Sequence, residues 1–311
     1  MDNEKVISHQ IDSTNSLSLT VEKITKKINN TGDLAYVTVA RQLDILEELM
    51  LFPFGRFLLE NKGINGYWTH YMVMHPQRGR LTGLNSDGKS FTNLEKFLLD
   101  NAPTLLATQQ RFVHFQRYLQ QEVKNNRSLA SIPCGLMGEL LTLDLTQVEN
   151  LTLVGIDLDP DSLSASQCLA KQLGLFDRVE YHCKDAWHLP FTGTFDAITS
   201  NGLNIYESDD ERVIELYKQF HQALVPEGVL VTSFVTPPSN LKEGIDTWAL
   251  SKINPDNLLL HKIIFSDIIN AQWQCFRTVE QTEKQLRAAG FCRFEFIFDN
   301  ARMFPTVIAK K

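Results

Sequence analysis

The stretch Leu129-Ala-Ser-Ile-Pro-Cys-Gly-Leu-Met-Gly138 decides the fold of this chain. It is a short apolar run that breaks into a glycine-containing turn, and a second apolar run follows from Leu151 to Ile156 and ends on Asp157. A strand, a glycine turn, a helix and a second strand that ends on a carboxylate build a nucleotide pocket, because the glycine lets a ligand approach the backbone and the carboxylate accepts hydrogen bonds from a ribose diol. Gly135 and Asp157 are separated by about twenty residues, the spacing found in such units.

The residues that follow have the pattern of a parallel sheet. From Leu129 onward, short apolar runs with strand character alternate with segments of helical periodicity. Only residues 299–304 separate the last two strands, too few for a parallel crossover, so these strands must form an antiparallel hairpin. We therefore predict an α/β fold, a doubly wound, seven-stranded, mostly parallel sheet with an antiparallel C-terminal hairpin. The predicted strands are residues 129–132, 151–157, 179–183, 197–200, 229–234, 291–298 and 305–309, and the predicted helices are residues 138–145, 160–173, 209–224 and 278–289.

The part of the chain before this sheet is predicted to be helical. Residues 1–33 are rich in Ser, Thr, Asn and Lys, and we expect them to form a flexible tail with no more than one short helix. Apolar side chains then recur at intervals of three and four, so residues 34–127 are predicted to form an N-terminal helical cap subdomain in front of a domain of residues 128–311. A long insert at about residues 236–277 carries four aromatic residues, which serve either as a substrate lid or as packing between the two subdomains.

The composition disfavours several classes of function. The 30 Lys and Arg residues against 37 Asp and Glu residues give a formal net charge of −7, which argues against a nucleic-acid partner. No apolar window approaches the length of a membrane span, and the first residues lack the pattern of a secretion signal. The five cysteines form no C-x-x-C pair and no paired-histidine motif is present, so we predict no metal site and a reducing, cytoplasmic location.

Motifs on successive strands carry a resemblance to a known family. They are, in order, Ile132-Pro-Cys-Gly135, Val154-Gly-Ile-Asp157, Lys184-Asp-Ala186, Phe195-Asp-Ala-Ile-Thr-Ser-Asn-Gly202, Leu224-Val-Pro-Glu-Gly228 and Leu286-Arg-Ala-Ala-Gly-Phe291. With these motifs, residues 128–311 resemble the class I S-adenosylmethionine-dependent methyltransferases, whose seven-stranded sheet ends in an antiparallel hairpin.

This resemblance implies S-adenosylmethionine as the cofactor. In the family, the first turn approaches the methionine part of the cofactor, the acid at Asp157 holds the ribose, the acid at Asp185 accepts from the adenine amino group, and the fourth motif lines the sulfonium. The cofactor-binding residues that the resemblance implies are Pro133, Cys134, Gly135, Asp157, Leu158, Asp185, Ala186, Trp187, Asn201 and Gly202.

The first motif departs from the family pattern. Ser131 stands where the family carries an acid, and Pro133 and Met137 stand where it carries glycines. A second hypothesis is therefore a cofactor-binding regulatory or interaction module without transferase activity. A third is an NAD-linked oxidoreductase, although Gly135 and Gly138 alone do not make the G-x-G-x-x-G cradle that a pyrophosphate needs.

The implied chemistry depends on orientation more than on a reactive side chain. Because the sulfonium methyl is already activated, transfer needs an in-line nucleophile about 3 Å away, exclusion of water and at most one base. Tyr206, His70, Tyr71 and His188 are the candidates for a proton acceptor or a substrate contact. His70 and Tyr71 lie in the aromatic segment Tyr67–His75, which is either a substrate wall or a helix packed in a core. The predicted reaction moves a methyl group to an O, N or C nucleophile of a small organic acceptor.

Overall fold

The computed structural model describes residues 17–238, 247–271 and 274–311, which fall into two compact units. The sheet unit contains residues 110–238, 247–249 and 274–311, and the helical unit contains residues 17–109 and 250–271. The division lies inside helix α7 (Pro103–Glu122) rather than at the predicted boundary of residues 127 and 128. The second half of α7 belongs to the sheet unit because Phe115 and Leu119 are buried in its core.

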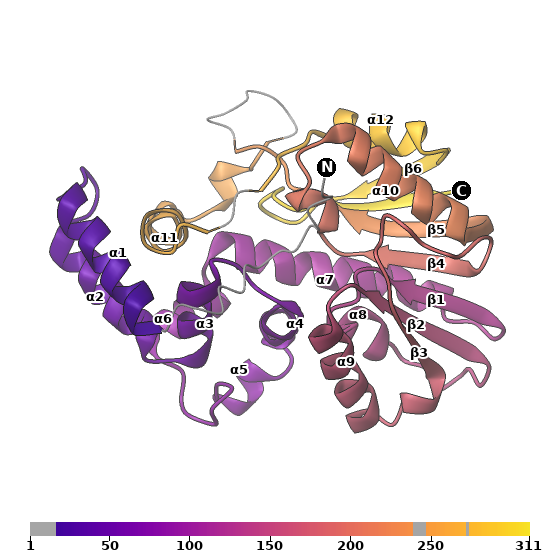
Figure 1. Ribbon diagram of the computed structural model, residues 1–311, viewed down its shortest axis with the longest axis horizontal. Coiled ribbons are helices and arrows are strands. Elements are labelled where there is room, and N and C mark those ends of the chain that lie inside the picture. Colours follow the sequence, from indigo (N-terminus) through magenta and orange to yellow (C-terminus); the bar gives the residue numbers. More distant parts are fainter. Residues whose placement is uncertain (1–16, 239–246, 272–273) are drawn as a thin grey trace. The chain divides into compact units, whose positions relative to one another are not determined.

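The sheet unit has the predicted α/β fold. Its seven strands are ordered β3-β2-β1-β4-β5-β7-β6, with β1 to β5 parallel and β7 antiparallel to both β5 and β6 (Figure 1). The doubly wound sheet and its C-terminal hairpin are thus confirmed. The strands are β1 (Arg127–Ser131), β2 (Leu151–Asp157), β3 (Val179–Cys183), β4 (Phe195–Ser200), β5 (Leu224–Ser233), β6 (Arg293–Ile297) and β7 (Thr306–Lys310).

Two elements of the sheet unit differ from their predicted lengths more than the others do. Strand β5 begins at Leu224 rather than Val229, because Leu224 pairs with Phe195 of β4 across a register shift. Helix α8 (Gly138–Leu141) ends before the predicted residue 145. The hydroxyl of Thr142 donates to the carbonyl oxygen of Gly138 at 2.6 Å, a side-chain bond that competes with continuation of the helix.

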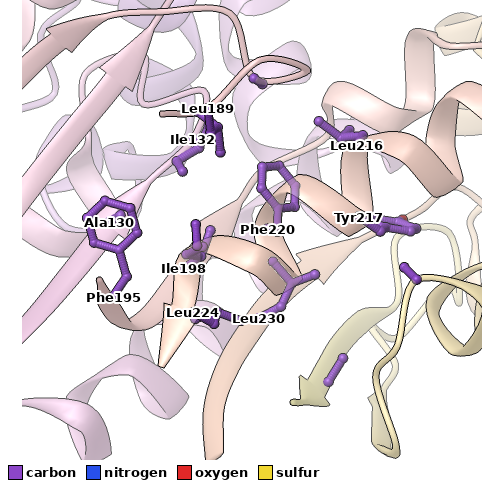
Figure 2. Close-up of a cluster of buried hydrophobic side chains, with 14 of the residues drawn as sticks. Ala130, Ile132, Leu189, Phe195, Ile198, Leu216, Tyr217, Phe220, Leu224 and Leu230 are labelled. Atoms are coloured by element: carbon purple, nitrogen blue, oxygen red, sulfur yellow. The ribbon is translucent and has the colours of Figure 1, made fainter. Parts of the chain in front are cut away.

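Helices cover both faces of this sheet. Successive residues of a strand point to opposite faces, so Leu129 of β1 joins a core cluster with α7, α8 and α9 (Pro160–Gln172). Its neighbour Ala130 joins a second cluster with α10 (Asp210–Ala223) and α12 (Val279–Ala288). Figure 2 shows this second cluster, in which Phe220 and Leu216 of α10 gather with Ile198 of β4 and Leu230 of β5.

The helical unit is built from short amphipathic helices. Helices α1, α2 and α3 pack on one another, and the aromatic segment predicted at Tyr67–His75 forms most of α4. Within this unit the Trp68 ring lies 5.2 Å from the Phe54 ring and 5.2 Å from the Tyr71 ring, so these aromatic residues form a packed cluster. The helices are α1 (Leu17–Thr31), α2 (Val39–Met50), α3 (Pro53–Asn61), α4 (Gly66–Met74), α5 (Gly79–Thr82) and α6 (Asn93–Asp100), followed by the first part of α7.

The tail predicted for residues 1–33, with no more than one short helix, contains one helix, which is longer than expected. Residues Leu17–Thr31 form α1, an amphipathic helix whose Ile28 is buried. Its polar composition hid the length of this helix, because tertiary packing of a narrow apolar face outweighs a weak local preference. The predicted tail residues 1–16 lie outside the described residues.

Residues 250–271 of the insert belong to the helical unit, whereas its described residues 236–238, 247–249 and 274–277 belong to the sheet unit. Residues 250–271 form η3 (Leu250–Lys252), α11 (Pro255–Lys262) and the π-helical segment η4 (Ile263–Ile268). The Lys27 ammonium donates to the carbonyl oxygen of Asp267 at 2.8 Å, and the Thr104 hydroxyl lies 2.7 Å from His261 Nε2. The insert is therefore joined to the N-terminal helices by specific polar contacts. Among the described residues, no helix has the length and apolarity required to cross a membrane.

Candidate functional site

The candidate site lies where the strand order of the sheet reverses. Strand β1 stands between β2 and β4, and its carboxyl end is bonded to both neighbours. The Ile132 amide donates to the Thr199 carbonyl oxygen at 2.8 Å, and the Cys134 amide donates to the Ile156 carbonyl oxygen at 2.9 Å. Such a switch point is where open α/β sheets bind ligands.

The carboxylate of Asp157 lies at the end of β2, beside the end of β1. It is 9% exposed, its Oδ2 accepts from the Gly135 amide at 2.8 Å and its Oδ1 accepts from the Asp159 amide at 3.0 Å. Burial raises the pKa of this carboxyl group. Each carboxylate oxygen can accept a second hydrogen bond, so Asp157 can hold the first turn and still receive two ribose hydroxyls.

A glycine next to this acid is required by close packing. A Cβ on Gly155 of β2 would lie 2.9 Å from Cδ1 of Tyr181 and 3.3 Å from the sulfur of Cys134. The contact with Tyr181 is shorter than a Cβ tolerates and the contact with Cys134 is tight, so any side chain at position 155 would force Tyr181 to shift and press on the first turn.

The first turn keeps the backbone conformation of a glycine-rich turn although a methionine occupies its last glycine position. Gly135 has φ 48° and Met137 has φ 57°, both in the left-handed region that glycine adopts freely. The side chain of Met137 is 1% exposed in the core cluster of α7, α8 and α9. Its burial offsets the cost of a left-handed backbone, which explains how a methionine stands at a glycine position.

The loop after β3 is joined to both β2 and α10. The Lys184 amide donates to the Asp157 carbonyl oxygen at 3.0 Å, and Asp185 Oδ1 accepts from the Trp187 amide at 3.0 Å. The Trp187 indole N–H donates to the carbonyl oxygen of Arg212 in α10 at 2.8 Å. The exposed His188 places its Nδ1 3.3 Å from Asp185 Oδ2, so its ring interacts with the acid predicted to face adenine.

The loop after β4 is fixed by a buried arginine. Gly202 adopts φ 92° and is followed by the short helix η2 (Leu203–Tyr206). Arg277 donates to the carbonyl oxygens of Asn204 at 2.9 Å and Glu207 at 2.6 Å, and to Asp210 Oδ1 at 3.1 Å. This guanidinium ties η2 and the start of α10 to the segment that leads into α12.

Two buried charged side chains in the same unit escaped sequence analysis. Glu139 of α8 accepts from the Ser131 hydroxyl at 2.6 Å, and Arg111 of α7 donates to the Ser233 hydroxyl at 3.1 Å. Burial raises the pKa of Glu139 and lowers the pKa of Arg111 to about 10, while nearby acids and Tyr206 oppose the shift of Arg111. Glu139 lies in α8, all of whose residues are buried, and Arg111 lies on the buried face of α7. A charged residue among apolar positions was the signal that could have found them.

The sheet brings the predicted cofactor residues to one edge. Pro133, Cys134 and Gly135 follow β1, Asp157 and Leu158 end β2, and residues 185–187 follow β3 through the Lys184 bond. Asn201 and Gly202 follow β4, which pairs with β1 through Ser131 and Thr199. The nine-residue helix α4 places His70 and Tyr71 in the helical unit, so those two remain predictions.

The candidate proton acceptors differ in environment. The Tyr71 hydroxyl donates to the fully buried Glu95 at 3.1 Å, and burial together with that acid raises the pKa of Tyr71. Burial lowers the pKa of His70 to about 4, so its ring is neutral at pH 7. Tyr206 follows β4 in the sheet unit, and burial raises the pKa of its hydroxyl.

Comparison with known proteins identifies the same kind of domain. Residues 134–228 match the family described as Methyltransferase domain. A Bordetella parapertussis protein described as a possible exported protein matches at 40% identity and a TM-score of 0.88, over 97% of this chain and 99% of that chain. No curated protein matches the sequence.

Two further solved structures are similar at low identity. A candidate O-methyltransferase from Nostoc punctiforme PCC 73102 matches at 14% identity and a TM-score of 0.49, over 79% of this chain and 70% of that chain. The apo form of the S-adenosylmethionine-dependent methyltransferase SibL matches at 14% identity and a TM-score of 0.49, over 95% of this chain and 94% of that chain.

Residues 134–228 therefore carry a methyltransferase domain, and the strand order and the acid at the end of β2 are those expected of the class I S-adenosylmethionine-dependent methyltransferases. The chain shares a family with the Bordetella parapertussis protein, which it matches over nearly the whole of both chains. It is an enzyme, and S-adenosylmethionine is its cofactor.

The residues at the switch point suit that cofactor. Asp157 presents a buried carboxylate for the ribose, and Gly135 has the left-handed backbone that lets a ligand approach the turn. Oδ1 of Asn201 is buried and has no hydrogen-bond partner among the described residues. A buried acceptor of this kind needs a donor, and a ligand at the end of β4 would bring one.

Proposed function

We propose that this methyltransferase moves the methyl group to an O, N or C nucleophile of a small organic acceptor. When bound, the cofactor supplies a methyl group on a positively charged sulfur, so the chain needs to orient the acceptor and exclude water. The observation that carries the proposal is the convergence of β1, β2 and β4 at one edge, fixed by the backbone bonds of Ile132, Cys134 and Gly135.

The region after β4 is our candidate for the acceptor side. Tyr206 follows Gly202 by a single turn of η2, in the same unit as the cofactor residues. Because burial raises the pKa of Tyr206, its hydroxyl stays protonated at neutral pH. We therefore assign Tyr206 the role of a hydrogen-bond donor that orients the acceptor, and not that of a general base.

A small acceptor also agrees with the charge of the chain. The formal net charge of −7 disfavours polyanionic acceptors such as nucleic acid.

A release assay tests this proposal. The purified enzyme is incubated with S-adenosylmethionine and a panel of small acids, amines, phenols and enolisable compounds, and the formation of S-adenosylhomocysteine is measured for each. We expect turnover with at least one member, and its loss or strong reduction in Asp157→Ala. Turnover confined to nucleic acid or to intact proteins would contradict a small acceptor.

We further propose that the enzyme works in a reducing compartment. All five cysteines are free, and three of them are exposed. Exposed thiols persist where glutathione keeps them reduced. Rapid alkylation of the protein in intact cells should label every cysteine as a thiol, and recovery of any of them in a disulfide would contradict the proposal.

A further inference from the structure

A row of hydroxyl side chains crosses the sheet at the carboxyl ends of its central strands. Ser131 of β1 pairs with Thr199 of β4, Thr199 pairs with Val231 of β5, and Ser233 lies two residues beyond Val231. Leu129, Ala197 and Val231 belong to the cluster of α7, α8 and α9, so the alternation of side chains places the three hydroxyl groups on that same face. All three residues are fully buried.

Charged side chains of opposite sign hold the two ends of this row. Glu139 of α8 accepts from the Ser131 hydroxyl at 2.6 Å, and Nη1 of Arg111 of α7 donates to the Ser233 hydroxyl at 3.1 Å. Glu139 is 5% exposed and Arg111 is 6% exposed. Strands β1 and β5 are separated by one strand, so the two ends lie roughly 10 Å apart at the backbone.

Both charges have unused bonding capacity. Among the described residues, neither Glu139 nor Arg111 takes part in an ion pair, and Nε of Arg111 has no hydrogen-bond partner. The hydroxyl of Thr199, between the two ends, is also without a partner in the described part of the chain. The Arg111 guanidinium lies 5.0 Å from the centre of the Phe304 ring, and Arg111 and Glu139 attract each other electrostatically. Buried charges that lack an ion-pair partner are costly, so this arrangement points to a ligand that carries both signs of charge.

The row borders the predicted cofactor residues. Ser131 immediately precedes the first turn, and Asn201, the first residue after β4, follows Thr199 by two positions. A Cβ built on Gly202 would lie 3.9 Å from Nη1 of Arg111, so the guanidinium reaches the loop predicted to line the sulfonium. An α-amino acid group has an ammonium and a carboxylate a few ångströms apart. One acid and one guanidinium at the two ends of the hydroxyl row can bind these two groups.

We propose that Glu139 and Arg111 bind the amino acid end of S-adenosylmethionine, Glu139 the ammonium group and Arg111 the carboxylate. The carboxylate on α8 then supplies the charge that Ser131 of β1 lacks, and the serine hydroxyl fixes its orientation. The inference rests on the methyltransferase function, since it assigns a subsite for the cofactor of that reaction.

Titration calorimetry with two ligands tests this assignment. S-adenosylhomocysteine contains the amino acid end, whereas 5′-methylthioadenosine has the same adenosine and sulfur without it. Glu139→Gln and Arg111→Met should each weaken S-adenosylhomocysteine binding by about 10- to 100-fold, the effect of losing one charged partner. Binding of 5′-methylthioadenosine should change less than about threefold, within the usual effect of a distant site.

Asp157→Ala is the matched control, because its carboxylate is assigned to the ribose that both ligands share. It should weaken both ligands together. Unchanged S-adenosylhomocysteine binding in Glu139→Gln, or equal losses for the two ligands, would overturn the subsite. Failure of the unaltered enzyme to bind either ligand would overturn the methyltransferase function itself, so the two failures are distinct. Ser131→Ala, which removes only the hydroxyl, provides a second variant should Glu139→Gln unfold, and it should also weaken S-adenosylhomocysteine selectively.

Discussion

Substitutions of Met137 can separate two contributions to stability, the strain of its left-handed backbone and the burial of its side chain. Its left-handed conformation (φ 57°) costs about 1–2 kcal/mol in any residue with a Cβ. Loss of the buried side chain costs about 2–5 kcal/mol, and the extra chain entropy of glycine costs about 0.5–1 kcal/mol. Met137→Gly should therefore lower the free energy of unfolding by about 2–4 kcal/mol even though it restores the family's glycine.

Met137→Ala removes almost the same side chain but keeps the backbone penalty. It should be less stable than Met137→Gly by about 0.5–1 kcal/mol. Leu140 is a matched control, since it is fully buried in the same cluster but lies inside helix α8. There the order should reverse, and Leu140→Ala should be more stable than Leu140→Gly by about 1 kcal/mol.

Equilibrium unfolding in urea, extrapolated to zero denaturant, measures all four variants. If Met137→Ala were as stable as Met137→Gly or more stable, the left-handed backbone at this position would be refuted. Two variants at that position within about 0.5 kcal/mol of the unaltered enzyme would refute the burial of the side chain, because that is the range of surface substitutions.

Three other changes address the site and its support. Asp157→Ala should weaken S-adenosylmethionine binding by about 1–3 kcal/mol, because the ribose hydroxyls lose a charged acceptor; an unchanged calorimetric Kd would mean that the site is misplaced. Since burial raises the pKa of Asp157, its protonation on acidification should weaken binding at a higher pH than an ordinary aspartate would; affinity that is flat down to pH 4 would contradict this. Arg277→Met leaves two carbonyl oxygens without their donor and should lower the free energy of unfolding by about 2–5 kcal/mol, whereas a urea midpoint equal to that of the unaltered enzyme would show that the arginine is dispensable. Gly155→Ala should cost about 1–3 kcal/mol by overpacking against Tyr181, and Tyr181→Ala in the same chain should recover part of that loss.

The sheet was predictable where sequence pattern and burial coincide. Strands β2 and β3 match their predicted bounds, β2 as a buried apolar run and β3 as a short run with a polar residue at every second position. The early start of β5 was not predictable, since Leu224 is followed by Pro226 and Gly228 and joins the sheet only through its pairing with Phe195. That pairing depends on two segments far apart in sequence.

The candidate site was predictable in its backbone and less so in its charges. An acid that ends a buried strand, such as Asp157, can be read directly from sequence. The bond from Arg111 to Ser233 joins residues separated by 122 positions, and no local pattern encodes it. The role of Glu139 was hidden for a different reason, because it depends on the first turn bringing its carboxylate back to the hydroxyl of Ser131, eight positions earlier in the chain.

Helix α10 is hydrogen-bonded to both loops that border the candidate site, the loop after β3 and the loop after β4. The indole of Trp187 holds its first turn through Arg212, and Arg277 joins Asp210 of the same turn to the loop after β4. Mechanical coupling follows, because restricting one loop lowers the entropy that remains to be lost by the other. Adenosine and a free amino acid, added as separate fragments, should then each raise the affinity for the other by the same factor, as reciprocal linkage requires.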